Sequence, residues 1–117
     1  MLIERTLLVN LMDESSKTHF SLSGKKVWVA GHNGMVGSAV TERLASEGCE
    51  LCNVTRSQLD LRDQIAVRKW LDKHKPNVIV LAAATVGGIL ANSSRPAEFL
   101  YDNLAIESNI IHGSYEI

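Results

Sequence analysis

The feature that most constrains the fold is a strand, a glycine turn and a helix in succession, from Lys26 to Glu47. Residues 26–30 are rich in Val and Trp, and this run is too short for a helix and typical of a buried strand. Gly31, Gly34 and Gly37 follow three residues apart, and a helical pattern begins there. The succession predicts an α/β fold built on a Rossmann-type, doubly wound parallel sheet.

Each glycine has a physical role if this turn binds a dinucleotide. Gly31 allows a sharp turn off the strand, Gly34 lets the backbone approach a pyrophosphate, and Gly37 lets the helix pack closely on the sheet. Unpaired N–H groups and the dipole at the helix start then face the phosphates. The predicted contacts run along the whole turn: Gly31, His32, Asn33, Gly34, Met35, Val36 and Gly37. A glycine-rich turn that binds no ligand is the alternative.

The helix after the turn has an amphipathic pattern. Val36, Val40 and Leu44 are expected on its apolar face, and Thr41, Glu42 and Glu47 on the opposite side.

Composition limits the class of protein and its partners. The chain of 117 residues has the length of one domain, and its 45% hydrophobic content is enough for a core. A net charge of −1 gives no reason to expect nucleic acid or an anionic membrane as a partner. No apolar run reaches the roughly 18 residues of a membrane span. Two cysteines and no recognisable secretory signal lead us to expect a cytoplasmic protein.

Residues 1–24 match no element of a nucleotide-binding fold, and we expect a loosely ordered N-terminal extension before a domain at 25–117. The stretch from Asp13 to Gly24 is polar and ends in Ser-Gly. Met12 looks like a more natural start, so residues 1–11 are interpreted as an upstream extension of the reading frame. A short helix over residues 3–12 is the alternative.

The residue that follows the second predicted strand decides between NAD and NADP. That strand is expected over Glu50–Val54, with Thr55 and Arg56 after it. An NAD-binding unit usually carries Asp or Glu there to accept a hydrogen bond from the ribose 2′-hydroxyl. Arg56 would instead bind a 2′-phosphate through charge-assisted hydrogen bonds, which favours NADP. A solvated loop charge is the alternative for Arg56.

The remaining elements alternate as a doubly wound sheet requires. A helix is predicted over Gln64–His74 with Asp63 as its N-cap, and a buried parallel strand over Val78–Ala82. Ligands of such sheets bind at the carboxyl ends of strands, where small residues admit a ribose or nicotinamide. These residues are Ala82, Ala83 and Ala84. Pro96 opens a last helix that is expected to end near Gly113.

The two cysteines form a C-x-x-C pair, Cys49 and Cys52. They lie at the start of a predicted strand rather than at a helix N-terminus, where a redox pair would be activated. One such pair also supplies too few ligands for zinc. We interpret both as packing residues.

Three strings closely resemble the GDP-L-fucose synthase family, which consists of extended short-chain dehydrogenases/reductases. They are AGHNGMVGSA at 30–39, LAAATVGGILAN at 81–92 and PAEFLYDNLAIESNIIH at 96–112. The resemblance implies a homodimer that uses NADPH to convert GDP-4-dehydro-6-deoxy-D-mannose to GDP-L-fucose. That reaction epimerises C3 and C5 of the GDP-sugar substrate and then reduces C4.

The resemblance also implies roles for individual residues. Asp60 and Leu61 would lie beside the adenine, and Asn103 near the nicotinamide ribose. A capping role for Asp60 and a plain helix-surface position for Asn103 are the alternatives. Asn33 stands where many members carry Arg, so binding of a 2′-phosphate would depend more on Arg56.

The residues that perform the family's chemistry are not in this chain. Reduction uses a Ser and a Tyr-x-x-x-Lys pair, in which Lys lowers the Tyr pKa so that its hydroxyl can protonate the carbonyl oxygen. Here Ala105 lies four residues after Tyr101, and no lysine follows Lys75. We therefore expect the N-terminal half of a Rossmann domain that is inactive alone, with an uncovered sheet edge and low solubility or partial disorder. The alternatives are another NAD(P)-dependent sugar-nucleotide epimerase or dehydratase, and a non-enzymatic NADP-binding module.

Overall fold

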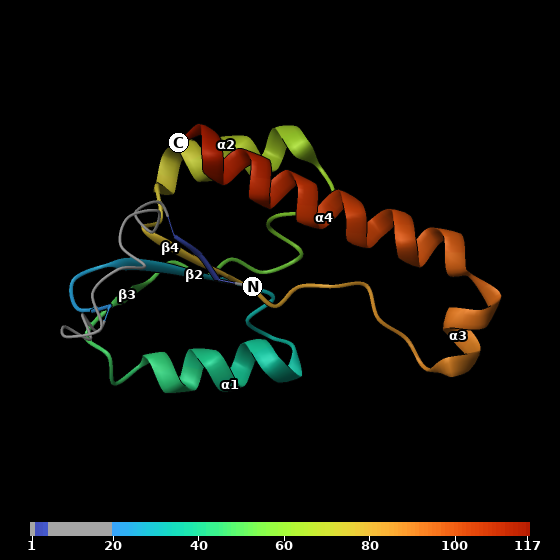
Figure 1. Cartoon of the computed structure of the whole chain (residues 1–117), viewed down its shortest axis with the longest axis horizontal. Coiled ribbons are helices and arrows are strands. Elements are labelled where there is room, and N and C mark those ends of the chain that lie inside the picture. Colours follow the sequence, from blue (N-terminus) through green and yellow to red (C-terminus); the bar gives the residue numbers. More distant parts are fainter. Residues whose placement is uncertain (1, 5–19) are drawn as a thin grey trace, which may run out of the picture.

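A computed structural model describes residues 2–4 and 20–117, and this part of the chain holds one sheet with helices on both faces. The strand order is β1-β4-β2-β3, and the strands are β1 (Leu2–Glu4), β2 (Lys26–Ala30), β3 (Glu50–Leu51) and β4 (Val78–Leu81). The helices are α1 (Met35–Leu44), α2 (Gln64–His74), α3 (Ile89–Ser94) and α4 (Pro96–Glu116). β2 is parallel to both β3 and β4, and α1 lies on the face of the sheet opposite α2 and α4 (Figure 1). The predicted Rossmann-type α/β architecture is confirmed.

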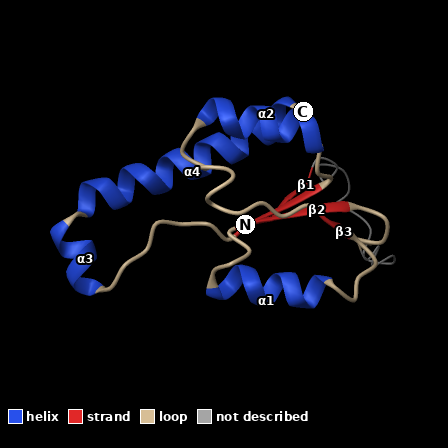
Figure 2. Ribbon diagram, turned by 180° about the vertical axis from the view of Figure 1, so that it is seen from behind, coloured by secondary structure: helices blue, strands red, loops and turns tan. Residues whose placement is uncertain are grey.

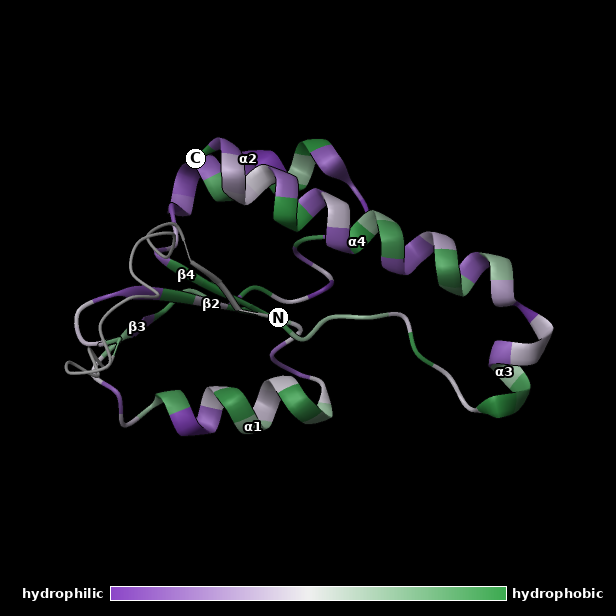
Figure 3. Ribbon diagram, in the orientation of Figure 1, coloured by the Kyte–Doolittle hydropathy of each residue, from purple (hydrophilic) through white to green (hydrophobic). Residues whose placement is uncertain are grey.

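The central strand β2 is buried on both faces. Val27 and Val29 point toward α1 and form one core cluster with Leu44 and Val78. Trp28 and Ala30 point the other way and form the larger cluster with residues of α2 and α4. Burial on both sides explains why this strand is an unbroken apolar run rather than an alternating one. In Figure 3, β2 and β4 accordingly show as green strands between the two helix layers.

The packing face of α1 differs from the predicted one. Val40 and Leu44 pack against the cluster below the sheet, but Val36 is exposed. Gly37 is instead the residue that packs closely against the glycine turn. A Cβ atom there would lie 1.9 Å from the carbonyl oxygen of Gly31. The predicted apolar face is therefore wrong at Val36, because it is Gly37 that packs against the glycine turn at the start of the helix.

The second predicted strand is much shorter than expected. β3 covers Glu50–Leu51 rather than residues 50–54. The Val29 N–H donates to Asn53 Oδ1 at 2.9 Å, so a side-chain oxygen replaces the backbone carbonyl that a longer strand would supply. After this residue the chain leaves the sheet and forms the loop that carries Arg56. β4 ends at Leu81, one residue before the predicted end, although the Ala82 N–H still donates to the Ala30 carbonyl at 2.9 Å.

α2 has the predicted bounds and the predicted cap. Asp63 Oδ1 accepts a hydrogen bond from the Ala66 N–H at 3.0 Å, which satisfies one of the unpaired donors at the helix start. Lys75 ends the helix in the left-handed conformation, with φ of 45°. Val67 and Leu71 are fully buried against the sheet.

The N-terminal segment contributes a strand that the sequence analysis did not assign. β1 pairs antiparallel with β4, with Ile3 opposite Ile79. The outer edge of β4, which was expected to be uncovered, is therefore paired over these residues. Strand pairing of this kind depends on a free edge far along the chain, so local sequence does not reveal it. The predictions for residues 5–19, including the loose extension and the alternative helix, lie outside the described residues.

α3 was not predicted, and α4 runs to Glu116 instead of ending near Gly113. The second half of α4 packs on α2, where Ile106 and Ile110 join the larger core cluster. The first half of α4 and α3 extend away from the sheet (Figures 1 and 2). The helix therefore has one end in the core and the other outside it.

Candidate functional site

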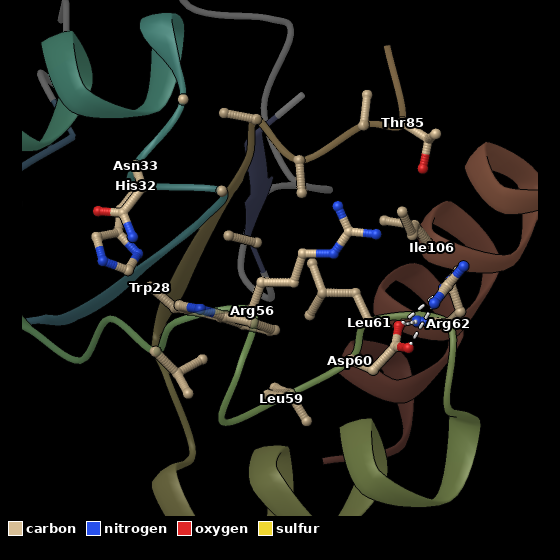
Figure 4. A pocket seen from close by; sticks show the side chains of 17 residues that line it. Trp28, His32, Asn33, Arg56, Leu59, Asp60, Leu61, Arg62, Thr85 and Ile106 are labelled. Atoms are coloured by element: carbon tan, nitrogen blue, oxygen red, sulfur yellow. Dashed lines mark hydrogen bonds and ion pairs between the residues drawn. The ribbon is translucent and has the colours of Figure 1, made fainter. Parts of the chain in front are cut away.

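A cavity of about 230 Å³ opens at the carboxyl ends of β2 and β4. Its walls come from β2, the glycine turn, the β3–α2 loop, the segment after β4 and Ile106 of α4 (Figure 4). The carboxyl edge of a doubly wound sheet is where such folds bind ligands. The lining residues are Trp28, Ala30, Gly31, His32, Asn33, Gly34, Val54, Arg56, Leu59, Asp60, Leu61, Arg62, Ala82, Ala83, Ala84, Thr85 and Ile106.

The glycine turn is held by close backbone contacts. Gly31 has φ of +89°, and a Cβ atom there would lie 2.6 Å from the backbone nitrogen of Ala83. The turn thus presses against the segment after β4 and needs both the left-handed conformation and the missing side chain. Gly34 is the N-cap of α1 and makes no side-chain capping bond. The first N–H groups of α1 therefore keep the free donors that bind anions at helix starts.

Arg56 projects into the middle of the cavity from the loop after β3 (Figure 4). Within the described part of the chain its side chain has no hydrogen bond and no ion pair. An unpaired guanidinium in a cavity is a ready binding group for a phosphate.

Arg62, the second arginine of the cavity, is in contrast paired with Asp60. Arg62 Nη2 lies 2.8 Å from Asp60 Oδ2, and Arg62 Nε donates to Asp60 Oδ1 at 3.0 Å. The Arg62 N–H also donates to Asp60 Oδ1, which closes an Asx turn. These hydrogen bonds from Arg62 lower the pKa of the Asp60 carboxyl to about 2. Asp60 is not the N-cap of α2, because Asp63 has that position.

Ten of the fourteen residues proposed from sequence line the cavity, and four do not. The ten are Gly31, His32, Asn33, Gly34, Arg56, Asp60, Leu61, Ala82, Ala83 and Ala84. Met35 and Val36 are exposed on α1 outside the cavity, and Gly37 is buried beneath the turn. Asn103, on α4, also stays outside.

Asn103 holds the segment after β4 through both ends of its amide. Asn103 Oδ1 accepts from the Thr85 N–H at 2.7 Å, and Asn103 Nδ2 donates to the Thr85 carbonyl at 3.1 Å. The plain helix-surface interpretation of this residue is wrong, since the side chain is committed to one backbone position. Its predicted place beside a nicotinamide ribose stays a prediction.

Sequence reasoning missed seven lining residues, Trp28, Ala30, Val54, Leu59, Arg62, Thr85 and Ile106. The alternation of β2 was an available signal, because Trp28 and Ala30 point to the same face. Ile106 comes from the far end of the chain, and only the packing of α4 brings it to this cavity.

Other candidate chemistry is limited in the residues that the structure describes. No group of three His, Cys, Asp or Glu residues could hold a metal ion there. Within residues 2–4 and 20–117 no helix is long and apolar enough to cross a membrane. Cys49 and Cys52 pack against opposite core clusters, as expected for packing residues. Burial raises the pKa of the Cys52 thiol to about 11.

Two curated proteins that are similar to this chain are both GDP-L-fucose synthases. The chain is 54% identical over 96 residues to a GDP-L-fucose synthase of Sinorhizobium fredii, and this covers 82% of the chain and 31% of that protein. It is 46% identical over 96 residues to the GDP-L-fucose synthase of Escherichia coli, covering 81% of the chain and 30% of that protein. The chain thus spans about a third of the length of these curated relatives.

A solved structure shares the fold of the described part. MlghC, a GDP-mannoheptose C4 reductase from Campylobacter jejuni with NADP bound, superposes with a TM-score of 0.75 at 39% identity. The match covers 80% of this chain and 30% of that one. Residues 27–116, which are more than half of the sequence, match the NAD dependent epimerase/dehydratase family. The chain therefore belongs to the NAD dependent epimerase/dehydratase family.

Proposed function

We propose that the cavity binds the adenosine half of NADP, and that the chain is the cofactor-binding part of a GDP-L-fucose synthase. The observation that carries this proposal is the unpaired guanidinium of Arg56 beside the glycine turn. At about 230 Å³ the cavity is smaller than the roughly 300–1,000 Å³ of a site that encloses a whole drug-sized ligand. This size suits one nucleotide of the cofactor better than the whole dinucleotide.

The residues present fit that half of the cofactor. The free N–H groups at the start of α1 would hold the pyrophosphate, and Arg56 the 2′-phosphate. Leu61, Ala83 and Ile106 supply an apolar wall for the base. No carboxylate follows β3 where an NAD-specific site would need one, since Thr55 and Arg56 stand there.

The chemistry of the whole protein would follow from its relatives. NADPH supplies the hydride in such reductions, and the proposed reaction is the epimerisation at C3 and C5 and reduction at C4 of GDP-4-dehydro-6-deoxy-D-mannose. The Ser and the Tyr-x-x-x-Lys pair of this chemistry would lie outside this chain. We propose that the chain alone has no turnover, and that the longer protein is a homodimer.

A second candidate is reduction of a different GDP-sugar. It is favoured by the likeness to the GDP-mannoheptose C4 reductase, whose name gives another sugar on the same nucleotide. Assays of the longer protein with each GDP-sugar separate these two reactions, because the sugar would be bound outside this chain.

The decisive test is a titration of the purified chain with NADPH, NADH, 2′,5′-ADP and nicotinamide mononucleotide. We expect NADPH and 2′,5′-ADP to bind more tightly than NADH, and the mononucleotide to bind most weakly. Arg56→Ala should weaken NADPH about 10- to 100-fold, the usual loss for one charge-assisted hydrogen-bonding group. Arg43→Ala is the matched control, because Arg43 lies in the last turn of α1, at the end away from the glycine turn, and pairs with Glu47.

The results against the proposal are equally specific. A folded sample that binds neither NADPH nor 2′,5′-ADP would contradict the cofactor site. Equal losses in Arg56→Ala and Arg43→Ala would contradict the role of Arg56. Turnover of the GDP-keto-sugar by this chain alone would contradict the proposed need for residues outside it.

A further inference from the structure

The β3–α2 loop begins with one tight turn over residues 55–59, which we call the 55–59 turn. The Thr55 carbonyl oxygen accepts hydrogen bonds from the N–H groups of Gln58 and Leu59, each at 3.0 Å. The Leu59 side chain is buried in the larger core cluster, so the end of the turn is fixed to the core. Arg56 lies inside this turn and projects from it into the cavity (Figure 4). The direction of the guanidinium therefore depends on how the turn is held.

The side chain of Gln58 closes the start of the 55–59 turn. Gln58 Oε1 accepts from the Thr55 N–H at 3.2 Å and from Thr55 Oγ1 at 2.8 Å. Because a backbone N–H can only donate, the amide oxygen of Gln58 is the atom that faces it. β3 ends at Leu51, so this N–H lies beyond the sheet and takes its acceptor from Gln58. A side chain that reaches back three residues to such an N–H is one half of a capping box, and T-x-x-Q is its sequence pattern.

Of the two arginines that line the cavity, Arg56 is the one that a phosphate can engage. The guanidinium of Arg62 is occupied on two sides: Nη2 lies 2.8 Å from Asp60 Oδ2, and Nη1 lies 3.3 Å from Asp102 Oδ2 on α4. NADP differs from NAD only by the 2′-phosphate on the ribose of its adenosine. A small displacement of the 55–59 turn would lengthen a hydrogen bond from Arg56 to that phosphate beyond the usual range of about 2.7–3.2 Å. Discrimination between the two cofactors should therefore depend on how firmly the turn is held.

We propose that Gln58 is a positioning residue that determines cofactor specificity, because it holds the 55–59 turn so that Arg56 points at the 2′-phosphate of NADP. The proposal rests on the proposed function for the identity of the ligand. Gln58 is not one of the residues that line the cavity, so it acts through Arg56. It should therefore affect the binding of NADP and leave the binding of NAD unchanged, since NAD has no 2′-phosphate for Arg56 to hold.

The experiment titrates the wild-type chain and Gln58→Ala with NADPH and with NADH, each followed by the fluorescence of the reduced nicotinamide. We expect NADPH to bind about 3- to 10-fold more weakly to the variant, the usual loss for one hydrogen-bonding side chain. NADH should bind the two chains equally, so the preference for NADPH falls by the same factor. Gln64→Ala is the matched control, because Gln64 is an exposed glutamine at the start of α2 and does not line the cavity.

Two further variants test whether Gln58 acts through Arg56. The double variant Arg56→Ala/Gln58→Ala should bind NADPH as weakly as Arg56→Ala alone, because the turn then has no guanidinium to direct. Thr55→Ser keeps both the N–H and the hydroxyl that Gln58 Oε1 accepts from, and it should bind NADPH like the wild-type chain. Gln58 is exposed, so its replacement should leave the chain folded, which circular dichroism checks before each titration.

Other outcomes would overturn the proposal. Equal weakening of NADPH and NADH in Gln58→Ala would show that Gln58 only stabilises the fold. An unchanged affinity of that variant for NADPH, or additive losses in the double variant, would show that Arg56 is directed without Gln58. These results leave NADP binding by the wild-type chain intact. A folded wild-type chain that binds neither ligand would instead refute the proposed function, and this inference with it.

Discussion

The two ends of α4 belong to regions with opposite properties. The body, which we define as the sheet with α1, α2 and residues 105–116 of α4, buries Trp28, Leu71 and Ile110 completely. The arm, residues 86–101, contains α3 and the first residues of α4 and leaves Ile89 88% and Leu90 86% exposed. Figure 3 shows the start of α3 in green although it lies far from the sheet.

The difference shows what fixes each region. The body is held by apolar burial on both faces of β2, which is non-directional and stabilises many contacts at once. The arm has helical local sequence but few partners, and its base is closed by the polar bonds of Asp102 and Asn103 to Thr85. The same type of substitution should therefore lower the free energy of unfolding strongly in the body and only slightly in the arm.

The largest contrast is expected from one leucine in each region. Leu71→Ala removes a fully buried side chain of α2 and should lower the free energy of unfolding by about 2–5 kcal/mol. Leu90→Ala removes an exposed one and should change it by less than about 0.5 kcal/mol. Urea unfolding followed by circular dichroism measures both. Similar losses in the two variants would mean that the arm is buried in solution.

A pair of glycines makes the same comparison for the backbone. Gly37→Ala places a Cβ atom 1.9 Å from the Gly31 carbonyl oxygen and should cost about 1–3 kcal/mol of stability. Gly88→Ala meets no atom within 4 Å, and we expect a change below about 0.5 kcal/mol. Thermal unfolding compares them, and NADPH binding should weaken only in Gly37→Ala. A well-folded Gly37→Ala chain would show that α1 can move away from the turn.

Acid should weaken the connection between the body and the base of the arm. The pKa of Asp60 falls from 3.8 in the unfolded chain to about 2 in the folded one, chiefly through hydrogen bonds from Arg62. Its contribution to stability is therefore complete well above pH 4 and is lost as the pH falls toward 2. Because the Asp60 side chain is about half exposed, water screens this interaction, and we expect Asp60 to contribute only about 0.5–1 kcal/mol to the free energy of unfolding. Between pH 6 and pH 2 the free energy of unfolding should fall less in Asp60→Asn than in the wild-type chain. An equal fall in both would count against a contribution from Asp60.

The smallest effect concerns Cys52, which lies in the body. Burial raises its pKa to about 11, so at pH 8 about one thiol in a thousand is ionised. In a Cys49→Ser chain, Cys52 should react slowly with iodoacetamide when folded and much faster in urea, as followed by mass spectrometry. Fast labelling of the folded chain would show that this face of the sheet opens.

Local sequence was a good guide wherever structure depends on near neighbours. The bounds of α2, its Asp63 cap and the position of β2 follow from periodicity, capping and apolar runs. The length of β3 did not follow, because Asn53 ends the strand through a side-chain bond to Val29 that periodicity does not encode. β1 also escaped prediction, since its pairing needs the distant edge of β4.

For the candidate site, the sequence by itself determined the glycine turn, Arg56 and the small residues after β4, because each lies at a strand end that the pattern locates. Only the tertiary structure decided that Arg56 is unpaired while Arg62 is held by Asp60 and Asp102. The two arginines look alike in the chain, and their partners lie up to 40 residues away. Which of them remains available to a phosphate depends on where α4 packs, and that packing is set by burial of Ile106 and Ile110 rather than by any local signal.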